Sequence, residues 1–205
     1  MGHVLHLDSS PRGERSHSRK LSKEILDSWL RTHPGDSVVY RDLGRAPVPL
    51  VDEPMIGAAF TPPEARTPEQ REAIKVSDEL VDELLAADTL IFGVPMYNFG
   101  VPAGFKAYID QIVRVGRTFS RPDFRGLAVG KKLIVAMSAG QEYAVGTPFA
   151  NYNFVEPYLR AVFGFIGITD LEFLAVATHD EASAARTFEA ALPAIHRATG
   201  EHRAA

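Results

Sequence analysis

Residues Thr89-Leu-Ile-Phe-Gly-Val-Pro-Met-Tyr-Asn-Phe99 decide the fold class of this chain. The first six form a mostly apolar run, which is typical of a strand buried on both faces. Pro95 stops the strand, and the residues after it supply two aromatic rings, a thioether and an amide. Open α/β sheets bind ligands at loops that leave the carboxyl ends of parallel strands. The stretch predicts such a sheet, with either a planar heteroaromatic ligand or an ordinary strand-to-helix connection at this loop.

Strand and helix patterns alternate on both sides of this stretch. Short apolar runs predict strands, and apolar residues at helical spacing predict a helix after each of them. The expected strands are residues 3–7, 37–40, 89–94, 132–137 and 171–176, and the expected helices are 21–30, 74–85, 105–112, 152–165 and 181–197. This order predicts a doubly wound parallel sheet with helices on both faces and right-handed crossovers.

Two connections carry further information. Thr67, Pro68 and Gln70 form a capping-box pattern, which predicts the start of the helix that precedes the strand at 89–94. Residues 43–63 are rich in proline and too long for an ordinary loop, so we expect this segment to be functional or partly helical. No repeat or linker interrupts the chain, so one domain is expected over 1–205, with a frayed tail from 199 to 205.

Composition limits the classes of function. The net charge of -4 gives no general attraction for nucleic acid, and the basic residues within 114–125 suggest a solvated face or contact with a small anion. No apolar stretch is long enough for a membrane span. The chain has no cysteine, which is compatible with a cytoplasmic protein, and the spacing of its seven histidines predicts no metal site.

Residues 9–18, Ser-Ser-Pro-Arg-Gly-Glu-Arg-Ser-His-Ser, follow the first expected strand. Four hydroxyls and two guanidiniums ahead of a helix are suited to a phosphate, and no Walker lysine follows the glycine. Alternatively, Ser16 or Ser18 only caps the helix. A dinucleotide fold is disfavoured, because Gly-x-Gly-x-x-Gly is missing from this loop.

Residues 138–143, Ser-Ala-Gly-Gln-Glu-Tyr, follow the fourth expected strand. Gly140 allows close approach of the backbone to a planar ligand, and Ser138 and Gln141 offer edge hydrogen bonds, although a glycine-containing surface loop needs no ligand. A phosphate at the first loop and a ring at the loop after Pro95 together describe one mononucleotide, because the preceding strands are expected to be neighbours.

These loops resemble those of the FMN-dependent NADH:quinone oxidoreductase and azoreductase family. The markers are residues 95–99 with Lys106, Tyr108 and Asp110 downstream, then 114–119, 130–132 and 164–170. The resemblance implies a flavodoxin-like sheet of order 2-1-3-4-5, tightly but non-covalently bound FMN, and NADH or NADPH as the electron donor. It also implies a homodimer with each active site at the subunit interface.

The resemblance implies roles for individual residues. FMN phosphate is expected at Ser10, Ser16, His17 and Ser18, the isoalloxazine ring along Met96, Tyr97, Asn98 and Phe99, and its pyrimidine edge at Ser138, Ala139, Gly140 and Gln141. Phe60, Phe119, Phe165 and Tyr143 are expected to line the substrate pocket. The family often has Ser-Arg-Gly-Gly at 138–141, and relatives can carry histidine near position 143.

The implied reaction reduces quinones by two electrons to hydroquinones and cleaves aromatic azo compounds to amines, by a ping-pong mechanism through the flavin. No protein residue is assigned as nucleophile or general acid, although Tyr143 could donate to the substrate. A flavodoxin-type electron carrier uses the same fold, but such carriers are smaller and more acidic. A flavin-free hydrolase acting on carrier proteins is the third alternative, and the chain has no matching nucleophile motif.

Overall fold

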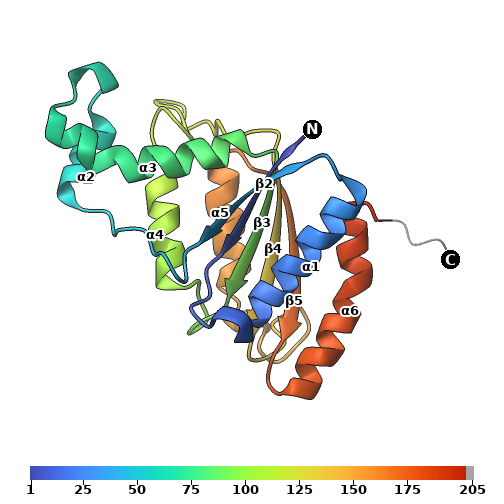
Figure 1. The fold of residues 1–205 in the computed structure, drawn as a ribbon. Helices are drawn as coiled ribbons and strands as arrows, with labels where there is room; N and C mark the ends of the chain where they lie inside the picture. The colour runs from blue at the N-terminus through green and yellow to red at the C-terminus, as the bar shows by residue number, and fades with distance from the viewer. Residues whose placement is uncertain (202–205) are drawn as a thin grey trace.

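The computed structural model describes residues 1–201 and contains a five-stranded parallel sheet (Figure 1). The strands lie in the order β2-β1-β3-β4-β5, which confirms the predicted flavodoxin-like order. Their bounds are β1 His3–Asp8, β2 Ser37–Asp42, β3 Thr89–Pro95, β4 Lys132–Ala139 and β5 Asp170–Ala177. All carboxyl ends therefore meet at one edge of the sheet, the lower edge in Figure 1.

Helices cover both faces of the sheet. Packed on one face are α1 His17–Thr32 and α6 Glu181–Thr199, and on the other are α3 Pro68–Ala86, α4 Ala103–Ile112 and α5 Val155–Phe165 (Figure 1). The larger core, between the sheet and the second helix layer, contains Phe92, Phe105, Tyr108 and Phe163 with their rings about 6 Å apart. Gly93 in β3 lets α1 pack closely, because a Cβ there would press against Asp8 and lie 3.1 Å from Ser22 Oγ.

The long connection after β2 contains a sixth helix. Residues Glu53–Phe60 form this helix, α2, and a short 3₁₀ turn follows it at Pro63–Ala65. Elsewhere in the chain, 3₁₀ turns lie at Gly13–Arg15 and Ala150–Tyr152. Asp52 caps α2 by accepting a 3.0 Å hydrogen bond from the Met55 N–H. The partly helical expectation for 43–63 is confirmed, and α2 with the start of α3 projects beyond the sheet (Figure 1).

The capping box of α3 forms as predicted. Thr67 Oγ1 accepts from the Gln70 N–H at 3.2 Å, and Gln70 Oε1 accepts from the Thr67 N–H at 3.1 Å. The fourth expected helix, 152–165, was predicted to start three residues early: residues 150–152 form a 3₁₀ turn, and the helix, α5, starts at Val155. No helix among residues 1–201 is both long and apolar enough to cross a membrane.

Two expectations from local sequence were wrong. Arg114 does not belong to a solvated basic face: its side chain is 2% exposed, and it donates to Ser77 Oγ at 2.6 Å and pairs with Asp78 at 3.1 Å. The tail is not frayed from residue 199, because Glu201 accepts hydrogen bonds from Arg31 at 2.8 Å and Ser28 at 2.6 Å. Residues 202–205 lie outside the described part of the chain.

Candidate active site

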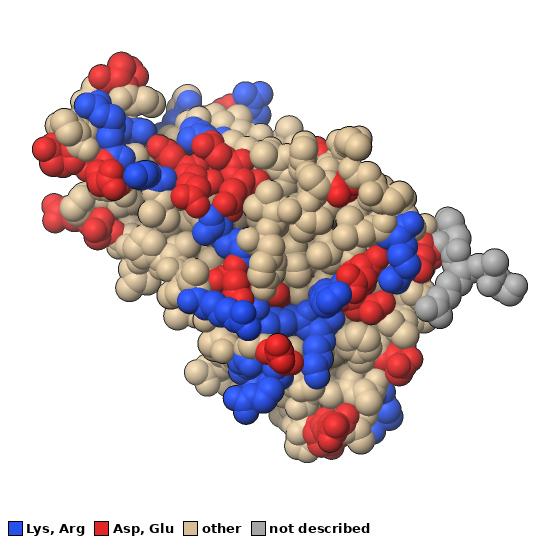
Figure 2. Space-filling view, viewed as in Figure 1, with Lys and Arg blue, Asp and Glu red and all other residues tan. Residues whose placement is uncertain are grey.

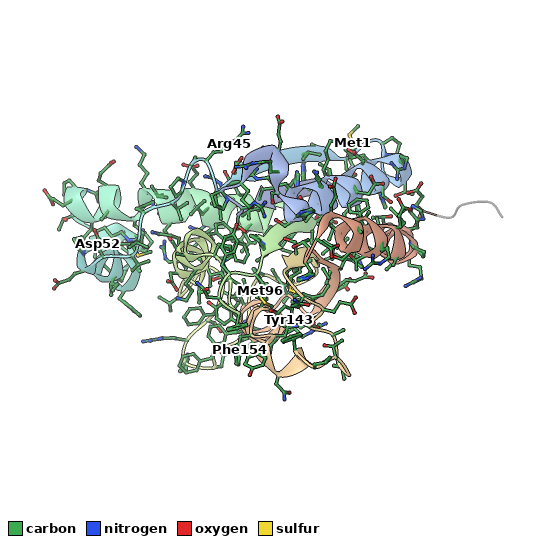
Figure 3. The ribbon with its side chains drawn as sticks, turned by 90° about the horizontal axis from the view of Figure 1, so that it is seen from below. Met1, Arg45, Asp52, Met96, Tyr143 and Phe154 are labelled. Carbon is green, nitrogen blue, oxygen red and sulfur yellow. The ribbon has the colours of Figure 1, made fainter. Side chains whose placement is uncertain are left out.

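One hollow joins the loops at the carboxyl edge of the sheet. It has a volume of about 270 Å³ and is lined by residues that follow β1, β3, β4 and β5. The lining consists of Ser10, Arg12, Ser16, His17, Pro95, Met96, Tyr97, Ser138, Ala139, Gly140 and Thr178. Figure 3 looks onto this edge, with Met96 and Tyr143 on the loops after β3 and β4. The predicted convergence of three loops is present, and β5 adds a fourth.

Arg19 holds the first loop in place. Its guanidinium donates to the Ser10 carbonyl oxygen at 3.0 and 2.6 Å, and the same group pairs with Asp42 at the end of β2. Gly44 lies against the Ser10 carbonyl so closely that a Cβ would come within 2.6 Å of the carbonyl carbon. The conformation of the loop after β1 therefore depends on residues that follow β2.

The end of this loop is the N-terminus of α1. Ser16 is the N-cap, since its Oγ accepts from the Arg19 N–H at 3.4 Å, so the predicted capping role is present. The cap leaves backbone N–H groups of the first turn, at His17 and Ser18, without helical carbonyl partners. These N–H groups and the positive end of the helix dipole suit an anion.

Positive charge surrounds the same loop. The pKa of His17 is lowered by partial burial and then by the nearby cations Lys20 and Arg12. On the outer side of the loop, the charged residues that line a second hollow of about 520 Å³ are four cations and two anions: Arg19, Lys20, Lys23, Arg45, Asp8 and Glu14. Figure 2 shows Lys and Arg side chains gathered over this part of α1. A dianionic group in the first hollow would meet a favourable potential.

The loop after β3 makes a tight, strained turn. Tyr97 and Gly100 exchange two backbone hydrogen bonds of 3.0 Å, and the residues between them, Asn98 and Phe99, have φ angles of 49° and 69°. A bulky side chain is rarely found in the left-handed region, and such strain concentrates at functional sites. The turn leaves the Tyr97 and Phe99 rings 37% and 44% exposed at the carboxyl edge.

The loop after β4 is held from both sides. The Ala139 carbonyl accepts from the Thr178 N–H at 2.7 Å and from Thr178 Oγ1 at 3.0 Å, while the Ser138 carbonyl accepts from the Met96 N–H at 2.8 Å. Gln141 Nε2 lies 3.2 Å from His179 Nδ1. Contacts from the residues that follow β5 thus stabilise the segment 138–141.

Several expected site residues lie beside the hollow rather than in its wall. Ser18 is fully buried, with its Oγ 3.1 Å from Ser16 Oγ. Gln141 and Tyr143 line a different cavity of about 390 Å³ beside β5 and α6, and the Tyr143 ring packs near Phe149 at a centroid distance of 6.1 Å. The Phe99 ring lies 5.2 Å from that of Tyr152.

Phe60, Phe119 and Phe165 lie together, but at the opposite edge of the sheet. Phe119 and Phe165 have ring centroids 4.9 Å apart, and Arg121 contacts Phe60. Because α5 runs from the carboxyl end of β4 to the amino end of β5, its last residue, Phe165, lies at the amino edge (Figure 1). These phenylalanines do not line the hollow of the single chain.

The sequence analysis missed two contributors, Thr178 and Arg19. Thr178 was detectable, because it directly follows a predicted strand at the same edge. Arg12, one of the two guanidiniums expected near a phosphate, does line the hollow. Arg19 acts from within a helix through contacts with β2, and no local pattern marks such a residue. No group of three or more metal-ligating side chains was found in residues 1–201.

Comparisons with known proteins agree with this geometry. A family described as having a flavodoxin-like fold matches residues 2–198. The chain is 59% identical over 176 residues to the FMN-dependent NADH:quinone oxidoreductase of Nostoc punctiforme, covering 85% of this chain and 86% of that one. It is 44% identical to FMN-dependent NADH:quinone oxidoreductase 1 of Pseudomonas fluorescens, covering 92% of each.

Solved structures show the same relationship. The azoreductase from Bacillus anthracis strain Sterne superposes with a TM-score of 0.87 at 29% identity, covering 98% of this chain and 100% of that one. Both the sequence and the fold are therefore matched over almost the whole length. The chain belongs to the flavodoxin-like family that contains the FMN-dependent NADH:quinone oxidoreductases and azoreductases.

Proposed function

We propose that this protein is an FMN-dependent oxidoreductase that uses NADH or NADPH to reduce quinones to hydroquinones and to cleave azo compounds. The observation that carries the proposal is the hollow at the carboxyl edge, where an anion site and exposed aromatic rings lie side by side. The names of the relatives support the cofactor and the acceptors. Because reduced nicotinamides are cytoplasmic metabolites, we also propose that the protein acts in the cytoplasm. We propose that residues 1–205 form one domain.

The residues of the hollow fit FMN. Ser10 Oγ, Ser16 Oγ, the Arg12 guanidinium and the N–H groups of His17 and Ser18 would hold the phosphate. The ring would lie along the turn that follows Met96, and the segment 138–141 would meet its polar pyrimidine edge. Ser10 Oγ lies 3.5 Å from Tyr97 Oη, so the phosphate and ring ends of the site are adjacent.

FMN held in this hollow would supply the redox chemistry, which is hydride acceptance from the reduced nicotinamide and two-electron reduction of the acceptor. The turn at 97–100 would present a flat aromatic slot that aligns donor and acceptor in succession, which gives ping-pong kinetics. Backbone N–H groups of the segment 138–141 and the Ser138 hydroxyl would stabilise negative charge at the pyrimidine edge. The protein's own part is therefore to bind, orient and stabilise charge.

We also propose that the active unit is a homodimer. The side of α5 that faces away from the sheet carries an exposed apolar row at helical spacing: Phe154, Pro157, Ala161 and Phe165. Phe154 is 59% exposed and Phe165 is 40% exposed, which is unusual for a continuous row on a monomer. A second copy with the same row is a natural cover, since two-fold interfaces are self-complementary.

Such a dimer would complete the substrate pocket. The row begins at the cofactor loop, where the Phe154 N–H donates to the Phe99 carbonyl at 3.3 Å, and ends at Phe165 beside Phe119. If two α5 helices pack antiparallel, the amino-edge phenylalanines of one subunit come next to the carboxyl-edge hollow of the other. The separated positions of the predicted pocket residues support this arrangement.

An arginine in the middle of the row should separate the subunits. We expect Ala161→Arg to weaken dimerisation by about 100-fold or more, because it buries an unpaired charge in the interface. Quinone reduction should fall with it, whereas the fold should persist, since Ala161 is exposed in the single chain. Analytical ultracentrifugation measures the mass, and Ala185→Arg on the exposed side of α6 is the control. An unchanged mass for Ala161→Arg would contradict this interface.

FMN binding should weaken as pH rises. Burial and the neighbouring cations lower the pKa of His17, and a phosphate dianion beside it would raise that pKa. Binding therefore takes up a proton, so the dissociation constant should increase a few-fold between about pH 6.5 and 8.5 as His17 loses its charge. Titration of the apoprotein with FMN measures this slope. His17→Gln should flatten it and His3→Gln should not; equal slopes in all three proteins would exclude His17.

The direct test is spectroscopic. The purified protein, or the apoprotein supplied with FMN, should show the visible absorption of bound flavin, and NADH should bleach it. Adding a quinone should then give continuous NADH oxidation, with parallel lines in double-reciprocal plots. A protein that cannot bind FMN would contradict the proposed function, and one that binds FMN but does not turn over NADH would be an electron carrier.

A further inference from the structure

Arg121 is a cation held between two aromatic rings. Its guanidinium carbon lies 5.1 Å from the centroid of Phe60 and 6.0 Å from that of Phe124. Both rings are more than half exposed, and Arg121 itself is exposed. None of the ion pairs within residues 1–201 includes Arg121, whereas Arg114 and Arg117 in the same segment pair with Asp78. The charge of Arg121 therefore has no protein counterion in the described chain.

The segment around Arg121 is well fixed. The Ser120 N–H donates to the Arg125 carbonyl at 2.8 Å, Ser120 Oγ binds Asp123, and the Leu127 N–H donates to the Thr118 carbonyl at 2.9 Å. The Phe124 ring also stacks 6.4 Å from the Phe119 ring. The loop thus presents the guanidinium at one place on the aromatic surface, at little cost in conformational entropy on binding.

Stacking also determines which atoms of Arg121 are available. Aromatic rings contact the flat face of a guanidinium, so its N–H groups, which lie in the plane, remain free to donate. Two parallel N–H groups match the oxygens of a carboxylate or sulfonate, a pairing that lysine cannot reproduce. A ligand that combines a flat aromatic body with an anionic substituent would use both the rings and the cation.

We propose that Arg121 determines acceptor specificity, favouring quinones and azo compounds that carry a carboxylate or sulfonate. This inference rests on the proposed function, because Phe60, Phe119 and Phe165 reach a cofactor site only in the proposed dimer. There, Arg121 lies on the wall that faces the partner's hollow and binds the anionic substituent of the acceptor. It is a specificity residue, and the electron transfer does not depend on its charge.

The test compares a neutral with an anionic acceptor in the intact holoenzyme. Arg121→Gln should raise the KM for 1,4-naphthoquinone-2-sulfonate about tenfold, which corresponds to about 1.4 kcal/mol. Its kinetics with unsubstituted 1,4-naphthoquinone should change less than about twofold. Intrinsic differences in reactivity between the quinones cancel, because each is compared between variant and wild type. Arg121→Lys should keep part of the preference, and added salt should reduce it in the wild type.

Matched controls separate the alternatives. Arg125→Gln removes the same charge from an exposed arginine four residues after Arg121, which has no aromatic ring stacked on it among residues 1–201, and should leave the kinetics with both quinones unchanged. Equal loss with both quinones, loss of preference in Arg125→Gln as well, or an unchanged KM would each overturn the inference. A KM raised for NADH alone would show that Arg121 binds the electron donor, and would also overturn the inference. If the wild type reduces neither quinone, the proposed function itself fails.

Discussion

Replacing Gly44 with alanine is expected to reduce the free energy of unfolding by about 3 kcal/mol and to abolish FMN retention. The added Cβ would lie 2.6 Å from the Ser10 carbonyl carbon and 2.7 Å from Arg19 Nη2. The Ser10 carbonyl is a backbone group of the proposed phosphate loop, so rotating a side chain cannot relieve the overlap with it. Either β2 and its loop separate from β1 or the phosphate loop moves, and both changes damage the site.

Urea unfolding of the apoprotein and FMN titration measure the two effects. Gly35→Ala is the matched control, because its Cβ would meet Met1 Cγ at an ordinary 3.5 Å, far from the hollow. We expect that control to change stability by less than about 0.5 kcal/mol. Wild-type stability and FMN affinity in Gly44→Ala would show that the loop after β2 does not support the phosphate loop.

The second large effect is expected for Arg19→Gln. Its side chain is 11% exposed and its guanidinium pairs with Asp42, lies 3.6 Å from Asp8, and donates to the Ser10 carbonyl. Removing it takes the buried counterion from both carboxylates and leaves Asp42 only the largely exposed Arg45 at 3.6 Å, which costs about 3 kcal/mol. The phosphate loop also loses its anchor, so FMN affinity should fall together with stability.

The pH dependence identifies the cause. Burial alone would raise the pKa of Asp42, but hydrogen bonds and charge from Arg19 outweigh it, and the pKa is lowered. A carboxyl group with a lowered pKa stabilises the fold above its unfolded-state pKa, and this contribution disappears as pH falls through the folded-state pKa. The difference between wild type and Arg19→Gln should therefore be full at pH 7 and shrink below about pH 4.

Lys23→Gln provides the comparison on the same helix. Lys23 pairs with Asp27 on the exposed side of α1, with side-chain exposures of 68% and 42%, so its loss should change stability by less than about 1 kcal/mol. Thermal or chemical unfolding at two pH values distinguishes the variants. If Arg19→Gln were no more destabilising than Lys23→Gln, the buried ion pair would have no structural role in the loop.

Much of the fold was predictable, because the spacing of apolar residues along the chain predicts the strands and helices. The apolar run from Thr89 to Val94 predicted a strand that is buried on both faces. The alternation of strand and helix patterns around it predicted parallel strands with helical crossovers. The capping box at Thr67 is likewise a local hydrogen-bond pattern. Local patterns fail at Arg114, because this buried arginine, in the loop after α4, depends on Ser77 and Asp78 in α3.

The candidate site also has features that the sequence predicts and features that it does not. The order of the strands along the chain was enough to predict which loops share the carboxyl edge, because parallel strands place every loop that follows a strand on one side of the sheet. Three features followed only from the folded chain: Arg19 and Gly44 shape the phosphate loop, Thr178 holds the segment 138–141, and the pocket phenylalanines gather at the other edge. Those outcomes depend on contacts between residues far apart in the chain, whose distances and angles are set by how whole helices pack on the sheet.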